Sequence, residues 1–305
     1  MVRSFPGKSG FFLCTIPLYD TPNKDKFQKN VSALCQAGPH LPLRPKTGII
    51  KNTQQILEKR LTVTENNDNQ KHFLTCEKTW VYFTLICVAG FWGAYTYLLR
   101  GGIFCNAQTG NVVLMGLALG SGEWNKAVYY LVPISAYILG AFVSELLPNP
   151  LKHRLKVRWD TLLILIEMLA VLALGFVPDS APVQISQVAI NFLASMQYNT
   201  FRQAEGVPVA TTFVTNHIRQ VGVGLAAELR HHRTGNTSHR RKWGRHAGML
   251  FFFITGAVVG TVFGRFLGGR SIWITILPLC VIFVTLLHAD LTTERALVEQ
   301  KPSGH

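Results

Sequence analysis

A group of amide and hydroxyl side chains interrupts an otherwise apolar stretch in the first half of the chain. Its members are Asn106, Gln108, Thr109 and Asn111, with Gly110 between them. Amide groups inside hydrocarbon must find hydrogen-bond partners, and the glycine permits a tight turn or a close helix approach. The pattern suggests a broken helix whose freed backbone groups line a polar site. A structural kink satisfied by neighbouring helices stays open as the alternative.

A second set of polar side chains follows one face of a later apolar stretch. Its members are Gln184, Gln187, Asn191, Ser195 and Asn199. They are spaced three or four residues apart, which places them on the same side of a helix, facing the interior of a bundle. Two interpretations stay open: the wall of a substrate pathway, or hydrogen bonds that join neighbouring helices.

Glu167 stands among leucine, isoleucine and methionine residues in the middle of an apolar block. An ionisable group at such a position is costly, which suggests a function such as proton coupling or cation binding. A protonated Glu167 that acts as a structural hydrogen-bond donor is the alternative. The sequence shows no nucleophile–base arrangement and no metal-ligand set. We therefore expect no enzyme activity, no catalytic residue, no bound metal and no cofactor.

These polar groups lie within a chain dominated by long apolar blocks. Of its 305 residues, 48% are hydrophobic and only 15% are charged, whereas soluble domains carry about 25% charged residues. A helix that crosses a bilayer needs about 20 apolar residues. Six blocks approach this length, at residues 79–99, 127–147, 161–177, 183–201, 248–263 and 272–287. Two shorter segments that contain glycine and polar residues lie at 103–119 and 211–229.

This organisation predicts an all-α, polytopic membrane helix bundle with about six spans and two broken or re-entrant segments. Residues 1–77 are polar and lack sustained periodicity, so we expect a disordered N-terminal tail. Residues 78–290 form the predicted transmembrane helical domain, and residues 291–305 form a C-terminal tail. The lipid bilayer is therefore the first expected partner.

The positive charge of the chain is explained by its position relative to the apolar blocks. The formal net charge is +14, and the lysines and arginines gather in the N-terminal tail and in two loops. The positive-inside rule places such loops in the cytoplasm. If both short segments re-enter, both basic loops and both termini lie on that side. We expect a multi-pass protein of the cell membrane and no nucleic-acid partner.

The two polar short segments resemble each other. The Thr-Gly-Asn run at 109–111 aligns with the Thr-Asn-His run at 215–217 when the chain is shifted by 106 residues. Each half, about 78–178 and 183–290, then contains one span, one short polar segment and two further spans. Three crossings per half make the halves inverted, a common transporter design with its site near the midplane. Chance similarity among apolar segments is the alternative.

Small residues recur every four positions in both halves. In the second half they are Gly256, Gly260, Gly264 and Gly268, and in the first half Ala136, Gly140 and Ser144. The segments around Gly140 and Gly256 align at a shift of 116 residues. Small residues at this spacing let helices approach closely, so we interpret them as packing positions.

The polar segment that ends at Asn111 also resembles a family motif. The run Gln108-Thr109-Gly110-Asn111 matches in full a motif of the YoaK family, bacterial multi-pass membrane proteins of unknown function. The run 196–199, Met-Gln-Tyr-Asn, matches a later family stretch loosely, which adds Gln197 to the candidate residues. The resemblance covers roughly residues 79–287. The acidic residue expected in the first helix is absent, because Gly-Ala-Tyr stands at 93–95.

Two functional hypotheses follow from the sequence. The first is a small secondary-transporter-like protein that binds a small molecule or an ion near the midplane. Its expected substrate-binding residues are Asn106, Gln108, Thr109, Gly110, Asn111, Glu167, Gln187, Asn191, Gln197, Asn199 and Thr215. The second is a non-transporting membrane scaffold or partner subunit, in which the small-residue faces drive assembly, including assembly of a homo-oligomer.

Overall fold

The computed structural model describes residues 73–148, 157–231, 238–298 and 302. These belong to one compact unit that begins at His72. Residues 1–72 of the expected disordered tail lie outside the described residues. Its last residues correct the expected boundary, because Thr75–Glu77 form the short helix η1 and are buried.

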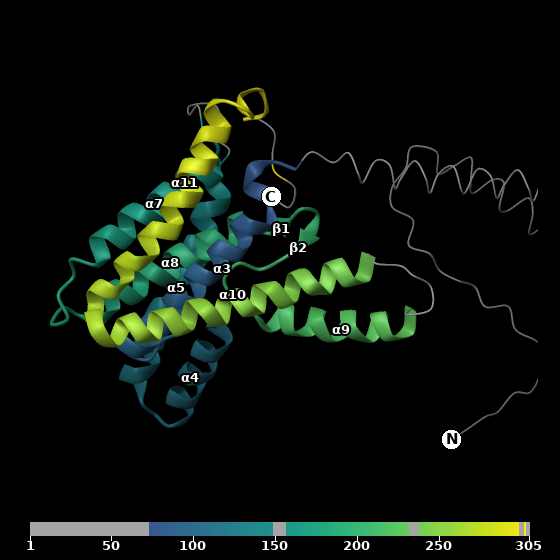
Figure 1. The fold of residues 1–305 in the computed structure, drawn as a ribbon. Coiled ribbons are helices and arrows are strands. Elements are labelled where there is room, and N and C mark those ends of the chain that lie inside the picture. Colours follow the sequence, from purple (N-terminus) through teal and green to yellow (C-terminus); the bar gives the residue numbers. More distant parts are fainter. Residues whose placement is uncertain (1–72, 149–156, 232–237, 299–301, 303–305) are drawn as a thin grey trace, which may run out of the picture. The chain divides into compact units, whose positions relative to one another are not determined.

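The described chain is mostly helical (Figure 1). Its first half contains α3 (Thr79–Leu99), α4 (Gln108–Gly120), α5 (Trp124–Leu146) and α7 (Trp159–Leu174). The second half contains α8 (Val183–Thr200), the strands β1 (Gln203–Ala204) and β2 (Val207–Pro208), α9 (Thr215–His231) and α10 (Ser238–Leu267). It closes with η2 (Gly268–Thr275), α11 (Ile276–Leu291) and η3 (Arg295–Leu297).

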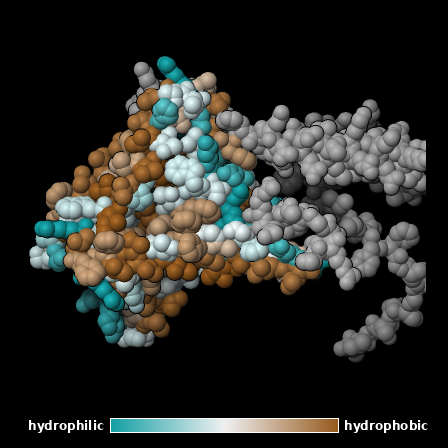
Figure 2. All heavy atoms as spheres, viewed as in Figure 1, coloured by the Kyte–Doolittle hydropathy of each residue, from teal (hydrophilic) through white to brown (hydrophobic). Residues whose placement is uncertain are grey.

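Apolar composition determines most of these helices. The 21 residues of α3 contain no charged side chain, and such a helix is stable only in a core or in a membrane. Among the described residues, three helical stretches are long and apolar enough to cross a membrane, by length and composition alone: Thr79–Leu99, Trp124–Leu146 and Lys242–Leu291. Figure 2 shows hydrophobic side chains over much of the face formed by α7, α11 and α10. The fold is compatible with a membrane helix bundle, and the six spans stay a prediction.

Close helix pairs hold the structure together. Helix α3 packs along α10, and α5 packs along α8, while α4 and α9 pack against α5 and α10 respectively. Glycines make the two long contacts possible. A Cβ atom built on Gly256 would lie 1.8 Å from the carbonyl oxygen of Cys87, and one on Gly140 would lie 2.3 Å from that of Phe192. The interpretation of these glycines as packing positions is confirmed.

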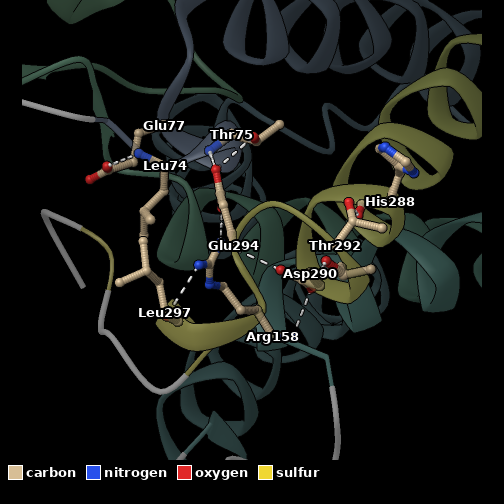
Figure 3. Close-up of polar contacts among 10 residues, drawn as sticks. Leu74, Thr75, Glu77, Arg158, His288, Asp290, Thr292, Glu294 and Leu297 are labelled. Atoms are coloured by element: carbon tan, nitrogen blue, oxygen red, sulfur yellow. Dashed lines mark hydrogen bonds and ion pairs between the residues drawn. The ribbon is translucent and has the colours of Figure 1, made fainter.

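A buried ionic network joins the chain around η1 to the first turn of α7 and the end of α11 (Figure 3). Arg158 Nη1 lies 2.5 Å from Glu294 Oε2 and 3.4 Å from Asp290 Oδ1. The other Glu294 oxygen accepts hydrogen bonds of 2.7 Å from the backbone N–H and the hydroxyl of Thr75. Thr161 Oγ1 donates to Asp290 Oδ2 at 2.7 Å. The expected C-terminal tail therefore contributes Glu294 to the packed structure.

The Glu294 carboxylate of this network predicts a loss of stability in acid. Burial alone would raise the pKa of Glu294, but hydrogen bonds from Arg158 and Thr75 hold it below its ordinary value of 4.5. A lowered folded-state pKa stabilises the fold fully above the unfolded-state value, and this contribution is lost as the pH falls through the folded-state value. We expect the denaturant concentration at the unfolding midpoint to decrease as the pH is lowered below about 5. Denaturant titrations from pH 7 to pH 3 would measure it, and Glu294→Gln should flatten that part of the curve.

Candidate functional site

The segment between α3 and α4 turns back along α3. Gly101 and Gly102 have φ angles of +81° and +73°, which residues with a side chain rarely adopt. Farther along the segment, Asn106 Nδ2 donates a hydrogen bond of 3.1 Å to the carbonyl oxygen of Ala89, near the middle of α3. The first turn of α4 therefore lies beside the middle of α3 and not beside its end.

A second returning segment leads into α9. Its antiparallel strands pair Gln203 with Pro208, and Glu205 and Gly206 form the turn with φ angles of 44° and 76°. The Glu205 carboxylate accepts a hydrogen bond from the Thr79 N–H at 3.1 Å and pairs with Arg245 at 2.8 Å. These contacts fix the hairpin to the start of α3 and to α10, and the chain then enters α9 at Thr215.

The starts of α4 and α9 face one cavity of about 440 Å³. Its lining residues come from α4 and α9, from the segments before them, and from α5, α8 and α10. They are Asn106, Ala107, Gln108, Thr109, Tyr137, Tyr198, Phe213, Val214, Thr215 and Phe253. None of these residues is charged. The residue before α4, Ala107, provides no side-chain cap, and the first N–H groups of a helix carry a partial positive charge. The cavity thus offers amide and hydroxyl groups beside the positive ends of two helices.

A hydrogen-bonded amide network supports the start of α4. Gln108 Nε2 donates to Asn191 Oδ1 at 2.7 Å, and Asn111 Nδ2 donates to Gln108 Oε1 at 3.1 Å. Asn191 Nδ2 in turn donates to the carbonyl oxygen of Gln187 at 2.8 Å, and Gln187 Nε2 donates to the Tyr129 hydroxyl at 2.6 Å. Because the Asn191 and Asn111 amides both bond to the Gln108 amide, the Gln108 side chain is held in a defined position at the edge of the cavity.

The structure brings together only part of the predicted site. The residues that line the cavity are Asn106, Gln108, Thr109 and Thr215. Four others adjoin these residues in the chain or belong to the network behind them: Gly110, Asn111, Gln187 and Asn191. The last three lie outside the lining: Glu167, Gln197 and Asn199.

The polar stripe on α8 contacts α5, whereas Glu167 lies buried on α7. Asn199 Nδ2 donates to Ser144 Oγ at 2.8 Å, and Ser195 Oγ donates to the carbonyl oxygen of Tyr137 at 2.5 Å. The polar stripe on α8 thus joins α8 to α5 by interhelical hydrogen bonds. Glu167 on α7 is fully buried, and neither carboxyl oxygen has a hydrogen-bond partner among the described residues. Its role in proton coupling stays a prediction.

Aromatic residues form much of the cavity wall, and the sequence did not indicate them as site residues. Tyr137 lies on α5, Tyr198 on α8 and Phe253 on α10, while Phe213 precedes α9. The rings of Tyr198 and Phe213 lie 4.5 Å apart between centroids. In the sequence Tyr137, Tyr198 and Phe253 stand in apolar blocks, where aromatic side chains are ordinary packing residues. Only the close packing of their helices reveals them.

The apolar helices define a class: a helical protein compatible with a membrane location. The chain belongs to the family described as protein of unknown function DUF1275, whose model matches residues 81–285. The matched range falls within that of the YoaK resemblance, and the YoaK name itself stays a prediction. No curated protein and no solved structure matches the chain.

Proposed function

We propose that this protein is a small secondary-transporter-like membrane protein that binds its solute in the cavity between α4 and α9. One observation carries the proposal: α4 and α9, far apart in the sequence, both begin at the same cavity, which α5 and α10 line near their middles. Transporters commonly place broken helices at a central site in this way, because the free backbone groups at the break can bind the solute.

Helix packing supports an arrangement of two inverted halves around this cavity. Helix α3, the first of its half, packs against α10, the third of the other half. In the same way, α8 packs against α5. The glycines at these contacts, Gly140 and Gly256, are the residues that the repeat aligns. Each meets a backbone carbonyl of the opposite half. Such a pair of equivalent interfaces permits the halves to rock against each other, which is the basis of alternating access.

The lining of the cavity favours an anion or a neutral hydrogen-bond acceptor over a metal cation. Its described side chains include no carboxylate, whereas metal cations such as magnesium and calcium prefer carboxylate and carbonyl oxygens. Two helix N-termini favour negative charge. A volume of about 440 Å³ and the aromatic walls suit a small organic or inorganic anion.

Anion uptake into vesicles tests this proposal. We expect purified protein in proteoliposomes to take up at least one of formate, acetate, nitrate and phosphate faster than protein-free vesicles do. Thr109→Asp or Thr215→Asp should lower this uptake at least about fivefold, because a carboxylate in the lining repels an anion. An acidic residue in the first helical turn also favours the helix, so these variants should fold.

The serine variants at the same positions are the matched controls. Thr109→Ser and Thr215→Ser retain the hydroxyl and should retain uptake within about twofold. Uptake of none of the four anions, or equal uptake by the aspartate and serine variants, would contradict an anion site in this cavity.

A membrane scaffold is the second candidate, and one observation favours it. The polar side chains of α8 are used in contacts with α5 and α4, as expected for a rigid bundle. In addition, α5 leaves Ile138 and Phe142 exposed on its surface, where a second copy or a partner helix could pack instead of lipid. A scaffold requires no water-filled pathway, so the two candidates differ in the accessibility of the cavity.

A further inference from the structure

A separate hollow lies at the end of the bundle where α7 and α10 finish. Its volume is about 660 Å³, and its lining includes Phe176, Asp179, Gly269, Arg270 and Trp273. These residues come from the loop after α7 and from η2. None of them lines the cavity between α4 and α9, so this hollow is independent of the proposed transport site.

Behind the lining of the hollow lies a buried arginine, Arg100, which has an unused donor and contacts the lining residue Asp179. The Arg100 side chain at the end of α3 is 1% exposed. Its Nε donates to the Tyr95 hydroxyl at 2.9 Å, and its Nη1 lies 3.3 Å from Asp179 Oδ1. No hydrogen-bond acceptor among the described residues reaches its Nη2. A buried guanidinium nitrogen without a partner is unusual, and it indicates a place for a further acceptor.

Glycine allows the guanidinium to lie directly against the backbone that lines the hollow. A Cβ atom built on Gly269 would lie 2.3 Å from Arg100 Nη2 and 2.6 Å from Asp179 Oδ1. Gly268 adopts a φ of +54°, which most residues avoid. Any side chain at position 269 would therefore separate the guanidinium from the backbone that lines the hollow. The two glycines thus form a cradle for the Arg100 guanidinium and the Asp179 carboxylate.

The charges around the cradle favour an anion. Arg100 and Arg270 provide two positive charges against the single carboxylate of Asp179, whose side chain is 74% exposed. An exposed carboxylate gains little from such a pair and exchanges readily for another acceptor. A free oxyanion could also use both Nη atoms, because guanidinium binds carboxylate and phosphate through two parallel hydrogen bonds.

We propose that this hollow binds a small oxyanion, a carboxylate or a phosphate group, on the Arg100 guanidinium, and that Asp179 occupies the same position when no ligand is bound. The ligand displaces the Asp179 carboxylate and supplies the acceptor that Nη2 lacks. Arg270 adds a second positive charge at the rim. Binding at this site requires neither transport nor an open cavity between α4 and α9.

The fluorescence of Trp273 reports on the hollow directly. Its indole lines the hollow and contacts Phe176 with 5.0 Å between ring centroids. Purified full-length protein in detergent is titrated separately with potassium phosphate and potassium acetate, and potassium chloride keeps the ionic strength constant. We expect a saturable change with at least one anion. Trp273→Phe should abolish the change, which assigns the signal to this residue among the six tryptophans.

Two substitutions should change the affinity in opposite directions. Asp179→Asn removes the competing charge from an exposed position and should tighten binding about three- to fivefold. Arg100→Lys keeps the charge but loses the paired donors, and it should weaken binding at least about fivefold. Glu123→Gln removes an exposed carboxylate that pairs with Lys126, and it should leave the affinity unchanged.

The affinity of Asp179→Asn decides the outcome even where Arg100→Lys folds poorly, because the aspartate is exposed. Tighter binding by Asp179→Asn with unchanged binding by Glu123→Gln supports the site. No saturable change with either anion overturns it, and so does an Asp179→Asn affinity equal to that of the parent. Failure of anion uptake in vesicles would affect only the proposed function.

Discussion

Replacing Arg158 with alanine is expected to lower the free energy of unfolding by about 3 to 5 kcal/mol. The guanidinium is buried between Asp290 and Glu294, both also buried. Its Nη2 additionally donates to the carbonyl oxygen of Leu297 at 3.1 Å. Removing the arginine leaves two carboxylates in a poorly solvated site without their counter-charge, and an unpaired buried charge is far costlier than a lost surface contact.

The matched control is a salt bridge between two solvent-exposed side chains. Lys126 pairs with Glu123 at 2.7 Å, with side chains 65% and 47% exposed, so Lys126→Ala should cost less than about 1 kcal/mol. Denaturant titration of both variants in the same micelles gives the two values. Equal losses would show that the ionic network around Arg158 contributes no more than an exposed pair.

The second large effect is expected at the contact between α3 and α10. Gly256→Ala should destabilise the protein by about 1 to 3 kcal/mol. The added methyl group would lie 1.8 Å from the Cys87 carbonyl oxygen and 2.7 Å from its carbonyl carbon. These are backbone atoms of a packed helix, so the methyl group fits only if the two helices separate. The separation weakens van der Waals packing along the whole contact.

Gly244 provides a control in the same helix. It lies in α10, and a Cβ atom built there meets no heavy atom within 4 Å. Gly244→Ala should therefore be neutral or stabilise the fold by up to about 1 kcal/mol, because alanine favours the helix. Both variants would be compared by denaturant titration and by thermal unfolding in detergent. A Gly256→Ala variant as stable as Gly244→Ala would contradict the close helix contact.

Long apolar blocks predicted the helices well where no other force competes. The block at 79–99 coincides with α3 at both ends. In contrast, α10 begins at Ser238 and not near residue 248, within a basic segment expected to be a loop. Tertiary contacts with α9 explain the difference. Gly224 of α9 packs on Trp243. The Nδ1 atoms of His217 and His246 lie 2.8 Å apart. Hydropathy carries no information about such contacts.

The candidate site was predictable only where its residues are local in sequence. Gln108 and Thr109 stand out as polar groups within an apolar segment, and the repeat points to Thr215. The aromatic wall was not predictable, because Tyr137 and Phe253 become neighbours of the cavity only through helix packing. The ionic network has the same origin, since Arg158 and Glu294 are 136 residues apart in the chain.

Cysteine accessibility from each side of the membrane tests the central claim most directly. Thr109→Cys and Thr215→Cys place a thiol in the cavity lining, one at a time, in a chain whose six native cysteines are replaced. Gln197→Cys, at a fully buried position outside the lining, is the control. A membrane-impermeant thiol reagent should label positions 109 and 215 from at least one side and leave position 197 unlabelled. Folded, inserted protein in which 109 and 215 are as unreactive as 197 would contradict a solute pathway through the cavity and favour the scaffold.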